Sequence, residues 1–316
     1  MSGVLVLGAS GFLGRHVVEH LLSEERYWPV TCVTRSRAAE LQESAERGRW
    51  IELDAVHRSA ADLGDLFAEV DPHAVVNCIG AIHAAEEELF DVNVHFVSDL
   101  VRALVEHGSS SLVHLGSAAE YGRQPRGVAI CESATPRPVT DYGQSKLSGT
   151  AIVCRAAGVG ALSARVLRIF NPLGSRSPES SVVGALALGI RNSLERGDEV
   201  VDVGDLGDFR DFVDARDVAR AVGAAALSQG DGSTILNIGR GEAVQVRLLA
   251  ARLASIGRFS GELREVAPAG PASRVAWQQA DISRARAELG WAPRYSLDEA
   301  VGALWSESDR ERSPAH

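Results

Sequence analysis

Near its start the chain reads Val4-Leu5-Val6-Leu7-Gly8-Ala9-Ser10-Gly11-Phe12-Leu13-Gly14. The first four residues are consecutive and apolar, which is typical of a strand covered on both faces. Leu13, Val17 and Leu21 follow at intervals of four and predict one face of a helix. Glycines between a strand and a helix let the backbone approach a pyrophosphate, whose charge the helix N-terminus stabilises. Tight turns often need glycine in any case, but this placement favours a dinucleotide site with the spacing G-x-x-G-x-x-G.

The composition excludes several classes of protein. With 45% hydrophobic and 23% charged residues among 316, the chain is globular rather than disordered. A formal net charge of −10 gives no basic face for nucleic acid. The longest uncharged apolar run, 182–190, is far below the roughly 20 residues of a membrane span, and no signal peptide is visible. The cysteines have no metal-ligand spacing, so we expect no metal, reduced thiols and a cytoplasmic protein; they are Cys32, Cys78, Cys131 and Cys154.

The order of the elements predicts an α/β fold. Short apolar runs alternate with helical patterns, which is the signature of βαβ units and a doubly wound parallel sheet of the Rossmann type. These runs lie at 4–7, 30–33, 50–53, 74–79, 111–115 and 163–169.

The alternation of strand and helix patterns stops at a segment rich in Pro, Gly and Ser, 171–181, which predicts a loop. A late strand at 235–238 and a helix around 217–227 return to the first region. We therefore expect a nucleotide-binding domain, a smaller discontinuous substrate domain and a flexible tail. Their predicted bounds are 1–170 with about 213–240, then 171–212 with 241–305, and 306–316.

Side chains at the end of the second strand favour NADP over NAD. An NAD site usually offers an acidic side chain there to the 2′-hydroxyl, whereas this chain has Thr34 followed by Arg35 and Arg37. The two guanidinium groups could hold a 2′-phosphate or merely solvate a loop. Asp54, after the third strand, is placed either to accept from the adenine amino group or to cap a helix.

A second motif carries acid–base chemistry. Tyr142 and Lys146 are four residues apart and share one face of a helix. A lysine ammonium near a phenol lowers the pKa of the phenol, so Tyr142 could donate or accept a proton near neutral pH. Ser117 ends a strand at the carboxyl edge of the sheet, where it could hydrogen-bond a substrate carbonyl oxygen.

With these motifs the chain resembles the extended short-chain dehydrogenases/reductases of the NAD-dependent epimerase/dehydratase type. The resemblance covers nearly the whole length. Its further markers lie at 78–81, 116–122, 168–172, 210–218, 281–283 and 288–291. It implies a Rossmann domain that holds NAD(P), a C-terminal domain that binds a nucleotide sugar, and a homodimer built on two helices, one of which bears Tyr142. Leu147 and Ile152 could join that interface or face the core.

The resemblance also implies roles for individual residues. Tyr142 is the acid/base, Lys146 holds the nicotinamide ribose, and Ser117 orients the substrate oxygen. The implied cofactor contacts are Gly8, Ser10, Gly11, Phe12, Leu13, Gly14, Arg35, Arg37, Asp54, Ala55, Cys78, Gly80, Ala81, Tyr142, Lys146 and Phe170. The implied substrate contacts are Ser117, Glu120, Asn171, Arg210 and Arg274.

Three of these assignments have alternatives in the sequence. Arg210 suits a phosphate, but it could instead form a salt bridge with one of the nearby aspartates at 208, 211 and 214. Asn93 matches the family's helix asparagine near the active site, or caps a helix. Arg274 could take over the phosphate contact of a family arginine, whose place Pro271 occupies.

Within the family, the residues after Ser117 indicate the reaction. Dehydratases carry acidic residues there, whereas this chain has Ala118 and Ala119. The pattern G-S-x-x-E-Y-G, followed by R-x-F-N and R-D-F-x-D-x-R-D-V, most resembles GDP-6-deoxy-4-keto-mannose reductases and related nucleotide-sugar 4-ketoreductases. This resemblance implies reduction at C4 of a dTDP- or GDP-linked 4-keto-6-deoxyhexose, with NADPH favoured and NADH possible, in deoxysugar biosynthesis.

Two other functions use the same fold. A nucleotide-sugar epimerase with retained NAD would use the same Ser, Tyr and Lys, although the missing acidic residue after the second strand argues against it. A non-catalytic NADPH sensor would usually have lost the tyrosine or the lysine, and this chain has both.

Overall fold

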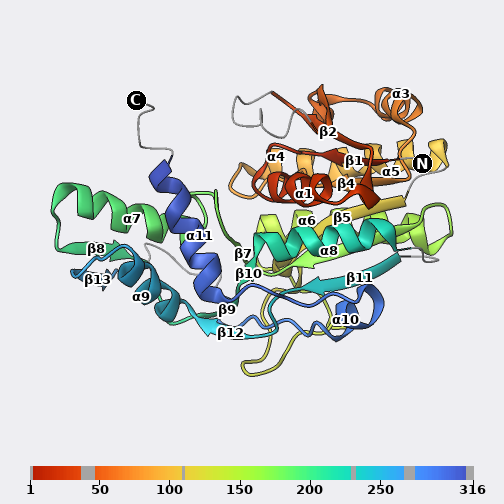
Figure 1. Cartoon of the computed structure of the whole chain (residues 1–316). Coiled ribbons are helices and arrows are strands. Elements are labelled where there is room, and N and C mark those ends of the chain that lie inside the picture. The colour runs from red at the N-terminus through yellow and green to blue at the C-terminus, as the bar shows by residue number, and fades with distance from the viewer. Residues whose placement is uncertain (1–2, 37–46, 109–110, 229–232, 267–274, 311–316) are drawn as a thin grey trace.

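The computed structural model of the chain describes residues 3–36, 47–108, 111–228, 233–266 and 275–310. Seven strands form one sheet in the order β11-β6-β5-β4-β1-β2-β3, and every neighbouring pair is parallel (Figure 1). The predicted doubly wound sheet is confirmed. Its strands are β1 (Val4–Leu7), β2 (Val30–Thr34), β3 (Arg49–Glu52), β4 (Ala74–Asn77), β5 (Ser111–Ser117), β6 (Ala164–Ile169) and β11 (Ser233–Ile238).

Helices cover both faces of this sheet. In Figure 1, α1 (Phe12–Ser23) and α8 (Ala215–Leu227) lie in front, and α5 (Phe96–His107) and α6 (Asp141–Gly158) lie behind. Alternate residues of β1 point into two separate cores, so its consecutive apolar residues are all buried. The remaining elements on this part of the chain are η1 (Glu25–Tyr27), η3 (Ala55–His57), α3 (Ala60–Val70), α4 (Glu86–Phe90), the π-helix η4 (Asp91–His95) and η5 (Ala118–Tyr121).

The edge strand β3 departs from the expected burial. Arg49 and Glu52 are exposed, and Trp50 and Ile51 are only half-buried. This strand lies at the edge of the sheet, with a neighbouring strand on one side alone, and its side chains are less enclosed than those of β1.

A smaller group of elements packs beside the sheet with a hydrophobic core of its own (Figure 1). Leu186, Ile190, Val201, Leu253 and Val301 belong to this core. Its main elements are α7 (Val182–Arg196), β8 (Val200–Val203), α9 (Val246–Ile256), β13 (Glu262–Glu265) and α11 (Leu297–Arg310). Two short strand pairs adjoin it, β7 (Pro172–Leu173) with β10 (Val213–Asp214) and β9 (Phe209–Asp211) with β12 (Ala243–Gln245).

The C-terminal part of the chain differs from the prediction at two points. Ile282, Ala285 and Trp291, around α10 (Ser283–Leu289), pack into the core of the sheet domain, although the predicted boundary assigns them to the smaller domain. Helix α11 continues to Arg310, so the flexible tail expected from residue 306 is helical over its first part. The division of the chain into domains stays a prediction.

Asp217 fastens this C-terminal segment to α8. Its buried carboxylate accepts the backbone N–H groups of Arg294 at 2.9 Å and Tyr295 at 3.0 Å. The carboxylate also pairs with Arg220 at 2.7 Å, and the backbone carbonyl of Asp217 accepts the indole N–H of Trp291 at 2.9 Å. One buried carboxylate therefore joins residues more than 70 positions apart.

Among the described helices, none is long and apolar enough to cross a membrane.

Candidate active site

The glycine turn between β1 and α1 is as tight as the sequence suggests. A Cβ atom on Gly14 would lie 2.0 Å from the carbonyl oxygen of Gly8, so only glycine fits there. Gly11 precedes α1, and no side chain caps the first N–H groups of this helix. Such a helix N-terminus, at the carboxyl end of β1, can accept the phosphate groups of a dinucleotide.

The end of β2 is held by hydrogen bonds. Thr34 is buried, and its hydroxyl oxygen lies 2.6 Å from that of Ser10 and 2.9 Å from the carbonyl oxygen of Ser36. Arg35 is exposed beside them, while Arg37 and Arg274 lie outside the described residues. Thr34 therefore fastens the glycine turn to the loop that carries Arg35.

Asp54 is the residue before η3, yet it caps no backbone group. Its carboxylate instead lies 2.8 Å from the imidazole Nδ1 of His57. Of the two roles considered for it, the helix cap is thus not found, and the contact with adenine stays a prediction. Ala55, the next residue, is buried.

Ser117 and Tyr142 meet at the carboxyl edge of the sheet. Strand β5 ends at Ser117, as expected for this residue, and the Ser117 side chain hydrogen-bonds the Tyr142 phenol. Tyr142 stands in the first turn of α6, which Thr140 caps by accepting the N–H of Gly143 at 3.1 Å. The expected pair is therefore assembled.

The pKa of Tyr142 differs from the expectation. Burial raises it above its ordinary value of 10.0, and the hydrogen bond with Ser117 offsets this only in part. The Lys146 ammonium donates instead to the carbonyl oxygen of Leu115, at 2.6 Å. The prediction of a lowered phenol pKa is therefore wrong for this structure, and the phenol holds its proton at neutral pH.

Lys146 is almost fully buried beside this pair, with 5% of its surface exposed. Burial lowers its pKa from 10.5 to about 8, and the charge of Glu120 opposes that shift. The sequence holds a signal that motif reasoning missed, because Lys146 is the only lysine among 32 basic residues. Every other basic side chain is an arginine.

Asn93 is buried and holds two segments of the site together. Its amide accepts the backbone N–H of Ala81 at 3.2 Å, and donates to the Ala81 carbonyl at 2.9 Å and to the Ser145 hydroxyl at 3.0 Å. It lies inside the π-helix η4 and caps nothing. Gly80, beside Ala81, is so placed that a Cβ atom would lie 3.9 Å from the Lys146 nitrogen. The segment that follows β4, from Cys78 to Ala81, therefore borders Lys146.

Residues 4–239 match the Epimerase family, described as the NAD dependent epimerase/dehydratase family. The match covers well over half of the chain. The chain belongs to this family. The resemblance stated from the motifs is thus confirmed, together with its Rossmann-type sheet.

Relatives within the family act in different ways. A dTDP-6-deoxy-L-talose 4-dehydrogenase (NAD(P)(+)) from Kitasatospora kifunensis is 34% identical over 307 residues, which are 96% of this chain and 94% of the relative. A UDP-glucose 4-epimerase from Streptococcus mutans is 26% identical over 335 residues, with 96% of each chain covered. The solved structure of MoeE5 in complex with UDP-glucuronic acid and NAD has a TM-score of 0.84 at 27% identity, covering 98% of this chain and 99% of that one.

Two residues expected to touch ligands are enclosed in this family member. Glu120 is fully buried, and its carboxylate faces Arg168, Thr150 and the backbone of Ser117. The ring of Phe170 is fully buried in the core. We therefore retain neither side chain as a direct contact with substrate or cofactor.

The other substrate candidates lie around β9. Asn171 has a positive φ of 25°, and its amide donates to the carbonyl of Asp211 at 2.9 Å and to the side chain of Gln278 at 3.1 Å. Arg210 pairs with Asp208 at 3.0 Å, so the salt bridge considered for it is present, with one of the three possible aspartates. A phosphate contact would have to compete with this ion pair.

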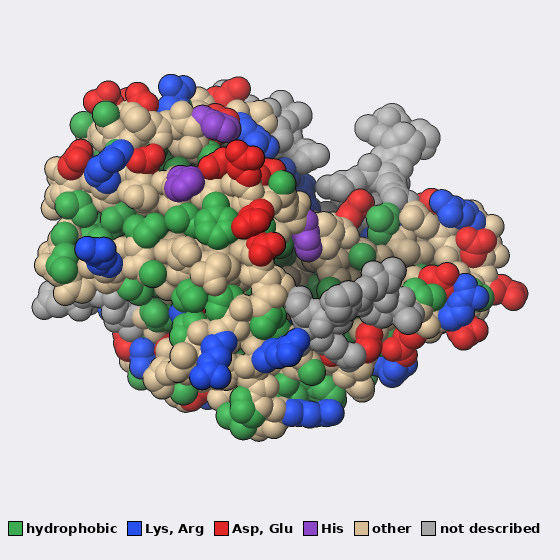
Figure 2. Space-filling model, turned by 180° about the vertical axis from the view of Figure 1, so that it is seen from behind, with side chains coloured by type: hydrophobic (Ala, Val, Ile, Leu, Met, Phe, Trp, Pro, Cys, Tyr) green, Lys and Arg blue, Asp and Glu red, His purple; other side chains and the backbone are tan. Residues whose placement is uncertain are grey.

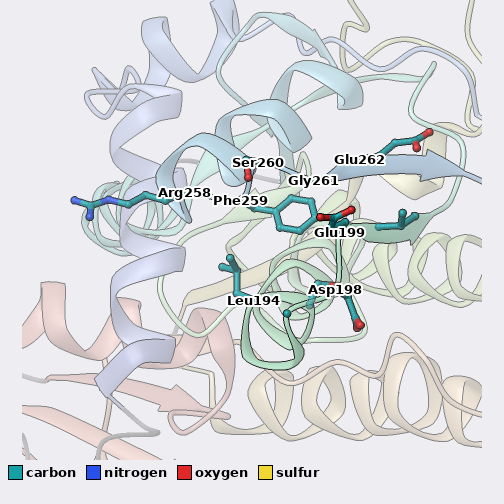
Figure 3. A pocket seen from close by; sticks show the side chains of 11 residues that line it. Leu194, Asp198, Glu199, Arg258, Phe259, Ser260, Gly261 and Glu262 are labelled. Atoms are coloured by element: carbon teal, nitrogen blue, oxygen red, sulfur yellow. The ribbon is translucent and has the colours of Figure 1, made fainter.

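Two cavities lie in the smaller part of the molecule. One of about 330 Å³ lies between the start of α7 and β8, with Leu186, Val203 and Asp205 in its wall. The other, of about 690 Å³, lies between the end of α7 and the turn into β13 (Figure 3). Neither is lined by a residue that the sequence singled out. No cluster of His, Cys, Asp and Glu suited to a metal ion occurs within the described ranges.

The burial of Lys146 predicts its titration. In protein with carbon-13-labelled lysine, the single lysine signal should titrate with a midpoint of about 8 rather than 10.5, so the ammonium loses its charge as the pH rises through 8. Arg196→Lys adds a matched exposed lysine on α7, which should titrate near the ordinary value of about 10.4. A Lys146 midpoint equal to that of the added lysine would contradict the prediction.

Proposed function

We propose that this protein is an NADPH-dependent 4-ketoreductase that reduces a nucleotide-linked 4-keto-6-deoxyhexose at C4, in deoxysugar biosynthesis. The observation that carries the proposal is the Ser117–Tyr142 pair beside Lys146, with the phenol in its protonated form. A ketone reductase needs a proton donor at the developing alkoxide, and this site has one. The 34% identity to a dTDP-sugar 4-dehydrogenase supports the same chemistry, since a dehydrogenase also transfers hydride at C4.

The chain's own residues have distinct tasks in this reaction. NADPH, when bound across the glycine turn and the uncapped start of α1, supplies the hydride. Ser117 and Tyr142 hydrogen-bond the carbonyl oxygen of the sugar, and Tyr142 gives up its proton as the negative charge develops there. Lys146, whose ammonium donates to the carbonyl oxygen of Leu115, would hold the nicotinamide ribose. Asn93 hydrogen-bonds both Ala81, at the edge of the site, and Ser145 of α6, and so holds these two segments together.

An epimerase with retained NAD is the principal alternative, and UDP-glucose 4-epimerases are among the relatives. It would oxidise and then reduce one carbon, so it would consume no NADPH. Net consumption of the cofactor therefore separates the two reactions.

The wild-type protein should oxidise NADPH in proportion to the ketosugar added. The dTDP- and GDP-linked 4-keto-6-deoxyhexoses are offered separately, and the loss of NADPH absorbance is followed. Tyr142→Phe should lower kcat by about 10²–10⁴-fold, because the proton donor is removed, while cofactor binding stays nearly unchanged. Tyr295→Phe is the matched control, since it removes a phenol hydroxyl at a site distant in the chain. Tight NADPH binding without turnover of either sugar would favour the epimerase.

The preference for NADPH is part of the proposal and rests on Arg35. The Arg35 side chain is exposed beside the Thr34–Ser10 contact. The end of β2 carries no acidic residue that would favour the 2′-hydroxyl of NAD. Arg35→Ala should weaken NADPH binding on the order of 10-fold or more, the usual worth of a hydrogen bond to a charged group, and leave NADH binding nearly as it was. Arg196→Ala is the control for loss of an exposed arginine. Equal losses for both cofactors would mean that Arg35 only solvates its loop.

We extend the proposal to a homodimer formed by α5 and α6. Val105 and Ala151 are exposed on these helices, and Val159 is exposed just beyond α6. Leu147 is half-buried and open to either role considered for it, whereas Ile152 is half-buried and packs against the core of the sheet. Figure 2 shows that hydrophobic side chains form a band across this face of the molecule. A second copy of the same face would cover it.

Sedimentation equilibrium should give twice the chain mass of 33.5 kDa. Ala151→Arg should produce monomers, because it places a bulky charge in the interface. Leu248→Arg, at an exposed apolar position on α9, should remain dimeric. A wild-type monomer at micromolar concentration would refute this part of the proposal. A cytoplasmic location belongs to the same proposal and is supported by four free cysteines.

A further inference from the structure

We infer that Glu120 is a positioning residue, which fixes the backbone of Ser117 and holds a negative charge against the face of α6 that carries Lys146, while Arg168 holds the Glu120 carboxylate in place. The inference deepens the proposed function and rests on it for the catalytic effect alone. Glu120 itself touches neither substrate nor cofactor.

The Glu120 carboxylate is the meeting point of three elements. One of its oxygens accepts the backbone N–H of Ser117 at 2.8 Å and the hydroxyl of Thr150 at 3.1 Å. The other accepts Nε–H of Arg168 at 2.8 Å. Glu120 is 0% exposed and Arg168 is 2% exposed, so no water screens their attraction. The carboxylate thereby links the end of β5, helix α6 and strand β6.

The surroundings are shaped to hold this ion pair. A Cβ atom on Gly116 would lie 2.7 Å from the Glu120 carboxylate, so glycine makes room for the charge. The Arg168 guanidinium stacks on the ring of Tyr121 with its carbon 4.4 Å from the centroid. The Tyr121 hydroxyl in turn donates to the side chain of Asn237 at 2.7 Å. A replacement of either charged partner therefore leaves the other buried and unpaired.

The link to the catalytic lysine follows from the helix. Thr150 is four residues after Lys146, so both side chains lie on the same face of α6, toward Glu120. Two groups act on the Lys146 charge from the neighbouring elements, Glu120 and Cys78, which follows β4. The charge of Lys146 acts in turn on His114 of β5. Burial raises the pKa of Cys78 to about 12 and lowers that of His114 well below 6.5. Of Glu120, Cys78 and His114, Glu120 is the one that forms an ion pair, with Arg168 at 2.8 Å.

Its negative charge acts in the same sense on both titrating groups of the site. It opposes the effect of burial on Lys146, and it adds to the effect of burial on Tyr142. Both groups are thereby kept protonated. A site held in this state is prepared to give a proton, which is what reduction of a ketone requires.

Glu120→Gln tests the inference without any need for substrate. Because Lys146 is the only lysine, its labelled side-chain signal reports its pKa directly. We expect the titration midpoint of Lys146 to fall by about 1 pH unit or more, which is the effect of losing a nearby opposite charge. With a ketosugar substrate, the fall of kcat at high pH should begin at a correspondingly lower pH.

Two further variants separate charge from structure. The double variant E120Q/R168M removes both members of the pair and leaves no unpaired ion, and its Lys146 midpoint should be lowered as in the single variant. Asp217→Asn is the matched control, because Asp217 is also a buried carboxylate that accepts backbone N–H groups and pairs with an arginine. It should lower the unfolding midpoint and leave the Lys146 midpoint unchanged.

Three results would overturn the inference. They are an unchanged Lys146 midpoint in both Glu120 variants, a return to the wild-type value in the double variant, and an equal shift in the Asp217 control. A lowered midpoint in a protein that reduces no ketosugar would support the role of Glu120 at Lys146 and count against the proposed reaction.

Discussion

The close approach of α6 to the end of β5 is the contact on which the candidate site depends. Two glycines of this helix make it possible. A Cβ atom on Gly143 would lie 2.7 Å from the carbonyl oxygen of Ala119, and one on Gly149 would lie 2.3 Å from that of Asn93. The helix can therefore lie against η5 and η4 at once, and it brings Tyr142 to Ser117. Larger residues at either position would push the phenol away from the serine.

This close packing has an electrostatic consequence. An ammonium group buried in a medium of low polarity is costly unless a partner compensates for it. Lys146 has the carbonyl oxygen of Leu115 at 2.6 Å and the negative charge of Glu120 near it. The compensation is partial, and the pKa of about 8 shows the remaining cost. The same packing that orders the site thus lowers the pKa of its lysine to about 8, within reach of neutral pH.

The sequence predicts the sheet and the approach of Tyr142 to Ser117, because both follow from local patterns. Consecutive apolar residues mark buried parallel strands, and the four-residue spacing of Tyr142 and Lys146 places them on one helix face. The sequence predicts a substrate contact for Glu120, which is wrong, and leaves two roles open for Asn93, both for a tertiary reason. Whether a carboxylate faces solvent or a buried arginine depends on β6, which is 48 residues from Glu120 at Arg168. The π-turn that contains Asn93 likewise leaves no clear mark in the local pattern.

The single lysine of the chain has a chemical consequence of its own. Arginine carries the positive charge everywhere else, and its guanidinium does not react with acyl donors as a free amine does. Acylation of a side-chain amine is therefore confined to one nitrogen, that of Lys146. That nitrogen lies in the candidate site, where 5% of the Lys146 surface is exposed. The fraction of lysine that is acylated, measured on the whole protein, would therefore give the fraction of candidate sites that have been modified.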